Sequence, residues 1–465
     1  MARCVDRLYL EDSVMAKTNR FVYVAAAIAA INGALFGYDT GIISGALLHI
    51  QKDFALSNFL QELVVSGVLV GAVLGAAVGG SLADRLGRRR IILITAGIFV
   101  VGAVGMGLSP GVWWLIVFRF VAGIGIGIAS IVGPLYISET APPQIRGSVV
   151  SFNQLAITSG ILIAYLVGFA LSFSGGWRLM LGLGAVPALV LGIGMLFMPE
   201  SPRWLVAHGE EEKARGVLER IDNEIDHEEG IRSIREAISQ ESGGASELLK
   251  GWIRPALVVG LGLAVLQQIT GVNTVIYYAP TIFYNTGFGG SASILGTVGV
   301  GVVNVLLTVA AILLVDRVGR RPLLLVGLLG MVASLGVLGL AFLLPALSGI
   351  VGWIAIVSLA LYIAFFAVGL GPVFWLLISE IYPQEVRGAA MSVASVGNWA
   401  SNLLVSLTFL SLVGAIGRPF TFWLYALVGV VAIVFVYFLV PETKGRSLED
   451  IQQLWIKRSG KANDR

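Results

Sequence analysis

Long stretches of apolar residues without a single charge dominate this sequence. Four of them run over residues 21–35, 64–78, 91–108 and 422–440. A helix needs roughly 20 mainly apolar residues to cross the ~30 Å hydrocarbon core of a bilayer. Only 13% of the residues are charged, about half the share of a typical soluble domain, so little polar surface is available to cover a water-soluble globule. The runs therefore predict membrane-spanning helices.

The number of these runs indicates an all-α membrane protein with twelve transmembrane helices. The ~10-residue alternating segments of a membrane β-barrel are missing. The first run continues past Tyr38 into Asp39 without a small-residue cleavage site, so it reads as a retained helix and not as a signal peptide. The runs are centred near residues 33, 71, 99, 123, 160, 188, 265, 303, 333, 365, 399 and 430.

The basic residues predict the orientation of the chain in the membrane. Most of the 31 Lys and Arg fall in the tails and loops that share one side if the N-terminus is inside, whereas the other side holds only Lys52, Arg178 and Arg418. Cytoplasmic loops carry such an excess of positive charge. We therefore expect a multi-pass protein of the cell membrane with both termini in the cytoplasm.

An internal repeat divides the predicted helices into two groups of six. Each pair of matching motifs follows the same helix of its group, which predicts two halves in one orientation and a site between them near the middle of the bilayer. The motif Asp-Arg-x-Gly-Arg-Arg recurs at 84–89 and 316–321, Ser-Glu at 138–139 and 379–380, and Pro-Glu at 199–200 and 441–442.

The repeat and the one long polar stretch also give domain boundaries. The stretch has helical periodicity and mixed charges, typical of surface helices. We predict a cytoplasmic tail at 1–20, a six-helix bundle at 21–199, linker helices at 200–251, a second bundle at 252–440 and a cytoplasmic tail at 441–465.

A series of motifs in fixed order resembles the sugar porter family of the major facilitator superfamily. The resemblance runs from about residue 21 to residue 451. It implies the two-bundle fold and transport of a monosaccharide by alternating access. The matching segments are Gly-Tyr-Asp-Thr-Gly at 37–41, the stretch at 79–89, Arg-Phe at 119–120, Pro-Glu-Ser-Pro-Arg-Trp-Leu at 199–205, Gln-Gln at 267–268, Gly-Pro at 371–372 and Pro-Glu-Thr-Lys-Gly at 441–445.

The resemblance implies a sugar site built from amide and aromatic side chains. Amides suit sugar hydroxyls because each offers an acceptor and two donors, and an aromatic ring packs on the apolar face of a sugar. Single buried amides more often bond neighbouring helices, but three of these lie in one predicted helix. The matching positions are Gln154, Gln267, Gln268, Asn273, Asn304, Trp375, Asn398 and Asn402 as hydrogen-bonding groups and Phe36, Tyr278 and Trp399 as lining or gating aromatics.

Asp39 and Arg119 are predicted to couple transport to protons. A charge inside the membrane costs at least ~2.5 kcal/mol, so it persists only with a partner or a task. The two residues are predicted at similar depths on the first and fourth helices. Related symporters carry Asp at this position, whereas facilitators commonly carry Asn. A permanent structural ion pair is the alternative interpretation.

The repeated charges on the cytoplasmic side form a candidate gate. Acids and bases recur at equivalent places in both halves, so networks of exchanging ion pairs are a possible latch, although basic residues also anchor topology without any such role. The residues are Asp84, Arg85, Arg89, Glu139, Arg146 and Glu200 in the first half and Asp316, Arg317, Arg321, Glu380, Arg387 and Glu442 in the second.

The seventh predicted helix has features of a mobile element. Residues 273–280 combine β-branched residues with Pro280, and proline removes a helical hydrogen bond. We therefore expect the end of this helix to unwind and to act as an outer gate. The match to animal members of the family departs at Ala367, where they carry a glutamate.

The sequence thus predicts a secondary active transporter that imports a monosaccharide with a proton. A facilitative uniporter is the nearest alternative, and a membrane sugar sensor is a weaker one. Expected partners are the sugar, the proton and the lipid bilayer, with no nucleic acid and a monomeric state. We expect no catalytic residues, no cofactor and no metal site, since Cys4 is the one cysteine and the three His are scattered.

Overall fold

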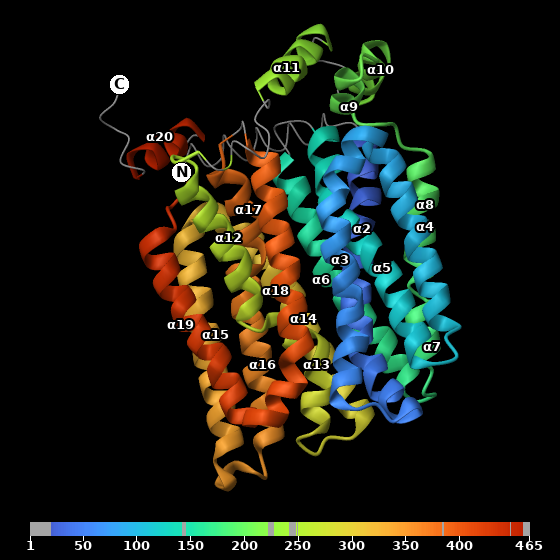
Figure 1. Cartoon of the computed structure of the whole chain (residues 1–465), viewed down its shortest axis with the longest axis vertical. Coiled ribbons are helices and arrows are strands. Elements are labelled where there is room, and N and C mark those ends of the chain that lie inside the picture. The colour runs from blue at the N-terminus through green and yellow to red at the C-terminus, as the bar shows by residue number, and fades with distance from the viewer. Residues whose placement is uncertain are drawn as a thin grey trace.

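The computed structural model describes residues 20–141, 146–221, 227–240, 248, 250–383, 386–446 and 448–458. Long helices run side by side through the molecule, and shorter helices cover one end of the bundle (Figure 1). The described residues contain no β-strand. The predicted all-α fold is confirmed.

The first half consists of six helical rods. Its fourth helix contains Pro134, and its sixth rod is interrupted at 183–184. The rods are α2 (Arg20–Phe54), α3 (Asn58–Leu86), α4 (Arg88–Gly107), α5 (Val112–Thr140), α6 (Arg146–Ser172), and α7 (Trp177–Gly182) with α8 (Ala185–Leu196).

The second half repeats this plan. Its first rod is broken after Ile269 and its fifth at Gly369. The rods are α12 (Arg254–Ile269) with α13 (Val272–Tyr284), α14 (Gly290–Val318), α15 (Arg320–Leu343), α16 (Val351–Val368) with α17 (Leu370–Ile381), α18 (Arg387–Ile416) and α19 (Arg418–Leu439). A 3₁₀ turn, η2 (Pro345–Leu347), precedes α16.

Four short helices of the described residues lie at one end of the bundle, which is called here the linker end; the other end is called the far end (Figure 1). Three belong to the segment between the halves: α9 (Pro202–Ala207), α10 (Glu211–Ile221) and α11 (His227–Gln240). The fourth is α20 (Leu448–Arg458), whose Trp455 is fully buried and donates its indole N–H to the Ile381 carbonyl at 2.8 Å. Helix α20 therefore packs against α17.

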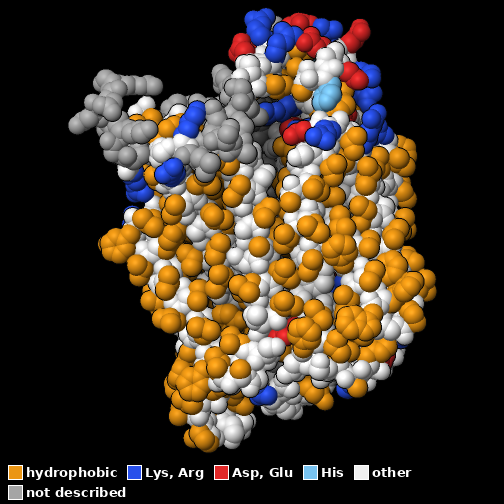
Figure 2. Space-filling model, in the orientation of Figure 1, with side chains coloured by type: hydrophobic (Ala, Val, Ile, Leu, Met, Phe, Trp, Pro, Cys, Tyr) orange, Lys and Arg blue, Asp and Glu red, His pale blue; other side chains and the backbone are white. Residues whose placement is uncertain are grey.

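The surface of the long helices matches a lipid environment. Apolar side chains cover their sides, whereas charged side chains gather at the linker end (Figure 2). Eleven segments of the described chain are long and apolar enough to cross a membrane. A further long rod, the 35-residue α2, begins with the first charge-free run of the sequence. A soluble monomer does not expose so large an apolar area.

Glycines allow α3 and α5 to pack with their backbones in contact. A Cβ atom on Gly123 would lie 1.9 Å from the Val68 carbonyl oxygen, and one on Gly71 would lie 2.2 Å from the Phe120 oxygen. Such distances are far below van der Waals contact. Small residues permit this close approach of helices in membranes, where packing and not hydrophobic burial drives association.

The seventh span breaks earlier than the sequence predicted. The expected unwinding over 273–280 is wrong, because α13 is helical from Val272 to Tyr284 and includes Pro280. The break lies at Thr270 and Gly271, and Gly271 has a φ of 90°. A left-handed conformation favours glycine, so the glycine, and not the proline, sets the end of α12.

Three helix pairs of the described chain form the main contacts between the two halves. The α3–α18 and α6–α14 pairs form the broad contacts, and α2 packs on α13. These pairs form the interface between the halves, which is called here the seam.

Candidate functional site

Four of the predicted amides form one hydrogen-bonded cluster on the second half, called here the amide cluster. Gln267, Gln268 and Asn273 come from the broken seventh span, and Asn398 comes from α18. Asn398 donates to Gln267 Oε1 at 2.7 Å and accepts from Gln268 Nε2 at 3.0 Å. Asn273 donates to Gln268 Oε1 at 2.6 Å. Asn398 is thus the centre of the cluster.

The cluster is tied to the helix breaks of the second half. Gln267 Nε2 donates to the Leu370 carbonyl at 2.7 Å, next to the break at Gly369. Gln267 and Gln268 precede the break at Gly271 by only a few residues. Broken helices at mid-membrane commonly carry the substrate site of a transporter, because their freed backbone groups line a cavity.

Asn402 lies one helical turn beyond Asn398 on α18 and is also buried. Its Nδ2 donates to the Tyr277 hydroxyl at 3.4 Å, and its Oδ1 accepts from the Ser406 hydroxyl at 3.1 Å. Tyr277 lies on α13, which packs on α2, the helix that carries Asp39. Tyr277, which sequence reasoning did not select as a site residue, therefore lies on the helix of the second half that contacts the helix of Asp39.

The other predicted polar residues do not join the amide cluster. Asn304 is buried on α14, Gln154 is half-buried on α6, and Trp375 is half-buried on α17, where its ring meets Phe374 edge-on at 4.8 Å. The hydrogen bonds of the amide cluster include none of these three. Their predicted contact with a sugar remains a prediction.

Two of the predicted aromatics meet across the seam. Phe36 of α2 and Trp399 of α18 pack edge to face with 5.2 Å between ring centroids. The Trp399 indole N–H also donates to the Ser130 hydroxyl of α5 at 3.3 Å. Tyr278 instead stays within the second half, where it donates to the Ser406 carbonyl at 3.2 Å and packs on Phe409.

Asp39 and Arg119 form a buried ion pair inside the first half. Arg119 Nη2 lies 3.7 Å from Asp39 Oδ2, and the side chains are 0% and 9% exposed. Arg119 Nη2 also donates to the Val65 carbonyl at 3.3 Å. Two further arginine nitrogens, Nε and Nη1, have no hydrogen-bond partner among the described residues. The arginine is thus paired but under-satisfied, which suits a contact that rearranges during function.

The Asp39 carboxylate also borders a small cavity. Phe99 of α4 and Leu181 of α7 contribute to its walls. The cavity lies within the first half and not between the halves. Asp39 on α2 and the amide cluster on α12, α13 and α18 therefore belong to different halves, and no residue of the cluster lines the cavity beside Asp39.

At the linker end of the first half, Glu139 and Glu200 organise a charged network. Glu139 accepts from Arg88 at 2.9 and 3.0 Å and from the Ser201 hydroxyl at 2.5 Å. Glu200 accepts from the backbone N–H groups of Arg89 and Ser201. These bonds join α4, α5 and the start of α9.

The second half repeats this network almost group by group. Glu380 accepts from Arg320 at 2.8 and 3.2 Å and from the Thr443 hydroxyl at 2.5 Å. Glu442 accepts from the backbone N–H groups of Arg320 and Arg321. The repeated sequence motifs thus encode a repeated structure.

The arginines that make these pairs are not those the sequence analysis selected. Arg88 and Arg320 bind the glutamates and also pair with Asp84 and Asp316 at 3.0 Å. Their place four residues after each aspartate, on one helical face, was a signal that could have identified them. The bonds described above all stay within one half. Their role as a latch therefore remains a prediction.

The remaining candidates of the gate have other contacts. The Arg89 guanidinium donates to the carbonyls of Met195 and Leu196, where α8 ends, and that of Arg321 donates to the Tyr437 carbonyl. Arg387 lies near the Tyr382 carbonyl at 3.4 Å. Arg85 and Arg317, which follow the aspartates of the two motifs, are both exposed. The side chain of Arg146 lies outside the described residues.

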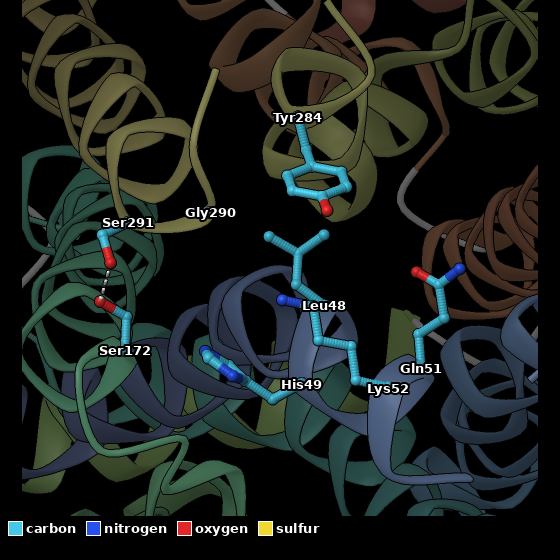
Figure 3. Close-up of a pocket in the computed structure, with 8 residues that line it drawn as sticks. All are labelled: Leu48, His49, Gln51, Lys52, Ser172, Tyr284, Gly290 and Ser291. Carbon is cyan, nitrogen blue, oxygen red and sulfur yellow. Dashed lines mark hydrogen bonds between the residues drawn. The ribbon is translucent and has the colours of Figure 1, made fainter. Parts of the chain in front are cut away.

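At the far end, the halves are in direct contact. The hydroxyls of Ser172 on α6 and Ser291 on α14 are 3.2 Å apart (Figure 3). The Lys52 ammonium lies over the Tyr284 ring at 5.8 Å, and both residues line a pocket of about 200 Å³ on this side of the seam. Tyr165 of α6 donates to the Ile276 carbonyl of α13 at 3.0 Å. The far end of the seam is closed.

Comparisons with known proteins agree on one family. The family model described as "Sugar (and other) transporter" matches residues 25–455. The D-xylose transporter of Levilactobacillus brevis is 44% identical over 443 residues, which cover 95% of this chain and 96% of that protein. The galactose-proton symporter of Escherichia coli K12 is 42% identical over 433 residues, which cover 92% and 93%.

Solved structures give the same result. The partially occluded, inward-open xylose transporter XylE from E. coli superposes with a TM-score of 0.81 at 34% identity. The match covers 92% of this chain and 99% of that one. The similarity therefore extends over both halves and is not confined to a shared motif.

Proposed function

This chain belongs to the sugar transporter family of the major facilitator superfamily, and from that premise we propose that it imports a monosaccharide together with a proton across the cell membrane. The amide cluster of Gln267, Gln268, Asn273 and Asn398 is the observation that supports this most directly. It places several hydrogen-bond donors and acceptors together beside broken helices.

The amide cluster supplies the sugar-binding surface in this proposal. Each amide exchanges a bond to a neighbouring amide for a bond to a sugar hydroxyl, so polar groups stay satisfied with and without substrate. Asn402, Asn304, Gln154 and Trp375 complete the site from the surrounding helices, and Phe36 and Trp399 close over the sugar.

Asp39 carries the proton. In the ion pair with Arg119 the carboxylate is stabilised in its charged form, and loss of that contact favours proton uptake. The sugar side responds through Tyr277, which bonds Asn402 and lies on α13, the helix that packs on the α2 helix of Asp39. One proton that moves down ~100 mV releases about 2.3 kcal/mol. This energy is enough to raise the internal sugar concentration some tens of times above the external one.

The proposal includes an orientation and a state. Both termini and the linker end face the cytoplasm, since the basic residues gather there. The protein acts as a monomer, with domains at the predicted boundaries.

With the far end closed, the structure corresponds to a state that faces inward, in which each charged network of the linker end is bonded within its own half. The networks act as a latch when the linker end closes.

Substitution of Asp39 separates a symporter from a uniporter. Asp39→Asn removes the titrating group but keeps its size, so we expect sugar exchange to continue while uptake against a gradient is lost. The measurement is uptake of labelled xylose, arabinose, galactose and glucose into proteoliposomes, with and without an uncoupler.

Asp53→Asn is a matched control for this experiment. Asp53 lies on the same helix, but it is exposed and pairs with Arg178 at 3.8 Å. We expect this variant to accumulate sugar as the unmodified protein does. Concentrative uptake by Asp39→Asn at an unmodified rate would contradict the proposed role of Asp39 and favour a uniporter with a structural ion pair.

A further inference from the structure

A second membrane carboxylate, Glu62, lies at the seam and has no place in the function proposed above. It occupies the second turn of α3, near the far end, and it is 0% exposed. Its Oε1 accepts from the backbone N–H of Ser411 at 2.7 Å, and its Oε2 accepts from the Ser411 hydroxyl at 2.6 Å. One residue of α18 therefore supplies both hydrogen bonds from the opposite half.

A buried carboxylate is usually compensated by an ion pair. Among the described residues, none of the ion pairs includes Glu62. The positive end of the α3 dipole acts mainly over the first helical turn, and Glu62 lies beyond it. The two Ser411 bonds are thus its main compensation for lost water.

Opening of the far end would separate α3 from α18 and return Glu62 to water. Burial of an unpaired carboxylate is costly, so its charge opposes closure of the seam. Hydrogen bonds to a charged group are worth more than neutral ones, so Ser411 opposes that penalty. The two effects act on the same step with opposite sign.

We propose that Glu62 and Ser411 form a charge-dependent latch that sets how readily the two halves close at the far end. Loss of the serine hydroxyl leaves one oxygen of a buried charge without a donor, which favours the open state. Replacement of the carboxylate by an amide removes the charge, so the closed state no longer depends strongly on Ser411.

A disulfide across the far end reports closure directly. Ser172→Cys with Ser291→Cys, in a Cys4→Ser background, places two thiols where the serine hydroxyls lie 3.2 Å apart. Cys4 is the one cysteine of the sequence, so the reporter pair has no competing thiol. The rate of disulfide formation under a mild oxidant, in membranes without sugar, then follows the closed population. The result does not depend on which sugar is transported.

The test is a double-mutant cycle with this reporter. Ser411→Ala should slow cross-linking about tenfold when Glu62 is present, and less than twofold when combined with Glu62→Gln, because the hydroxyl then serves a neutral group. Ser66→Ala is the control, since that hydroxyl donates only to the Glu62 backbone carbonyl within α3. It should leave the rate unchanged. Equal slowing by Ser411→Ala in both backgrounds, or no slowing in either, would overturn the latch.

Discussion

At the scale of single residues, the proposed mechanism depends on amide side chains that hydrogen-bond one another until the substrate binds. Asn398 shows this best, because it bonds Gln267, Gln268 and the Ala264 carbonyl at once. A residue with so many bonds holds the geometry of its neighbours. It is therefore expected to matter for sugar affinity even where it does not touch the sugar.

Asn398→Ala should raise the KM for sugar about tenfold. Loss of the central amide of the cluster removes roughly one net hydrogen bond, worth ~1.4 kcal/mol. Initial uptake rates over a range of sugar concentrations measure the change. Gln61→Ala is the matched control, since Gln61 is an equally buried amide that bonds only its own loop at the Leu56 carbonyl. An unchanged KM in Asn398→Ala would show that the amide cluster is only structural.

Glu442 gives a prediction about pH at the same scale. Burial alone raises its pKa, but the backbone N–H groups of Lys444, Arg320 and Arg321 outweigh burial and hold the pKa below its usual value of 4.5. A lowered pKa in the folded state means that the charged form stabilises the fold above the unfolded pKa. This contribution is lost as the pH falls through the folded value.

Glu442→Gln should therefore lower the Tm of the purified protein near neutral pH. The difference from the unmodified protein should shrink as the pH falls below about 4.5. Thermal unfolding at a series of pH values measures it. A difference that grows toward low pH would contradict the role given to these N–H bonds.

At the scale of helices, close backbone contact and positive φ angles explain where the glycines lie. Gly87 and Gly319 have φ values of 95° and 103°, and an added Cβ at either would clash with Glu200 or Glu442. The repeated Asp-Arg-x-Gly-Arg-Arg motif thus requires glycine for two reasons, the positive φ angle and the lack of space for a Cβ atom. The sequence predicted the repeat, but it did not show that the glycine makes room for a glutamate that lies more than a hundred residues away.

Gly123→Ala should destabilise the first half far more than Gly80→Ala. The added Cβ at Gly123 would overlap the Val68 carbonyl, whereas at Gly80 it would meet no atom within 4 Å. Strain from overpacking costs about 1–3 kcal/mol, while alanine in an open helical position costs nothing. Thermal unfolding of both variants in one detergent compares them. Equal stability of the two would mean that α3 and α5 are not in backbone contact.

At the scale of the whole molecule, the sequence predicted what depends on repetition and composition. The helical class, the two halves and the amides of the seventh span followed from charge-free runs, repeated motifs and a family resemblance. The break at Gly271 was not predicted, because a helix break depends on one residue's φ and on the packing of Tyr425 against it. Pairings across the seam, such as Trp399 with Ser130 or Glu62 with Ser411, were equally hidden, since they depend on how two separate bundles dock.

Sugar-dependent proton flux tests the central claim most directly. The sugar that gives the highest uptake rate is added to lightly buffered, de-energised cells or vesicles, and the external pH is recorded. Symport predicts an immediate rise in external pH as protons enter with the sugar, and the rise should be abolished by an uncoupler and absent in Asp39→Asn. Rapid sugar uptake by the unmodified protein without any change in external pH would contradict proton-coupled transport.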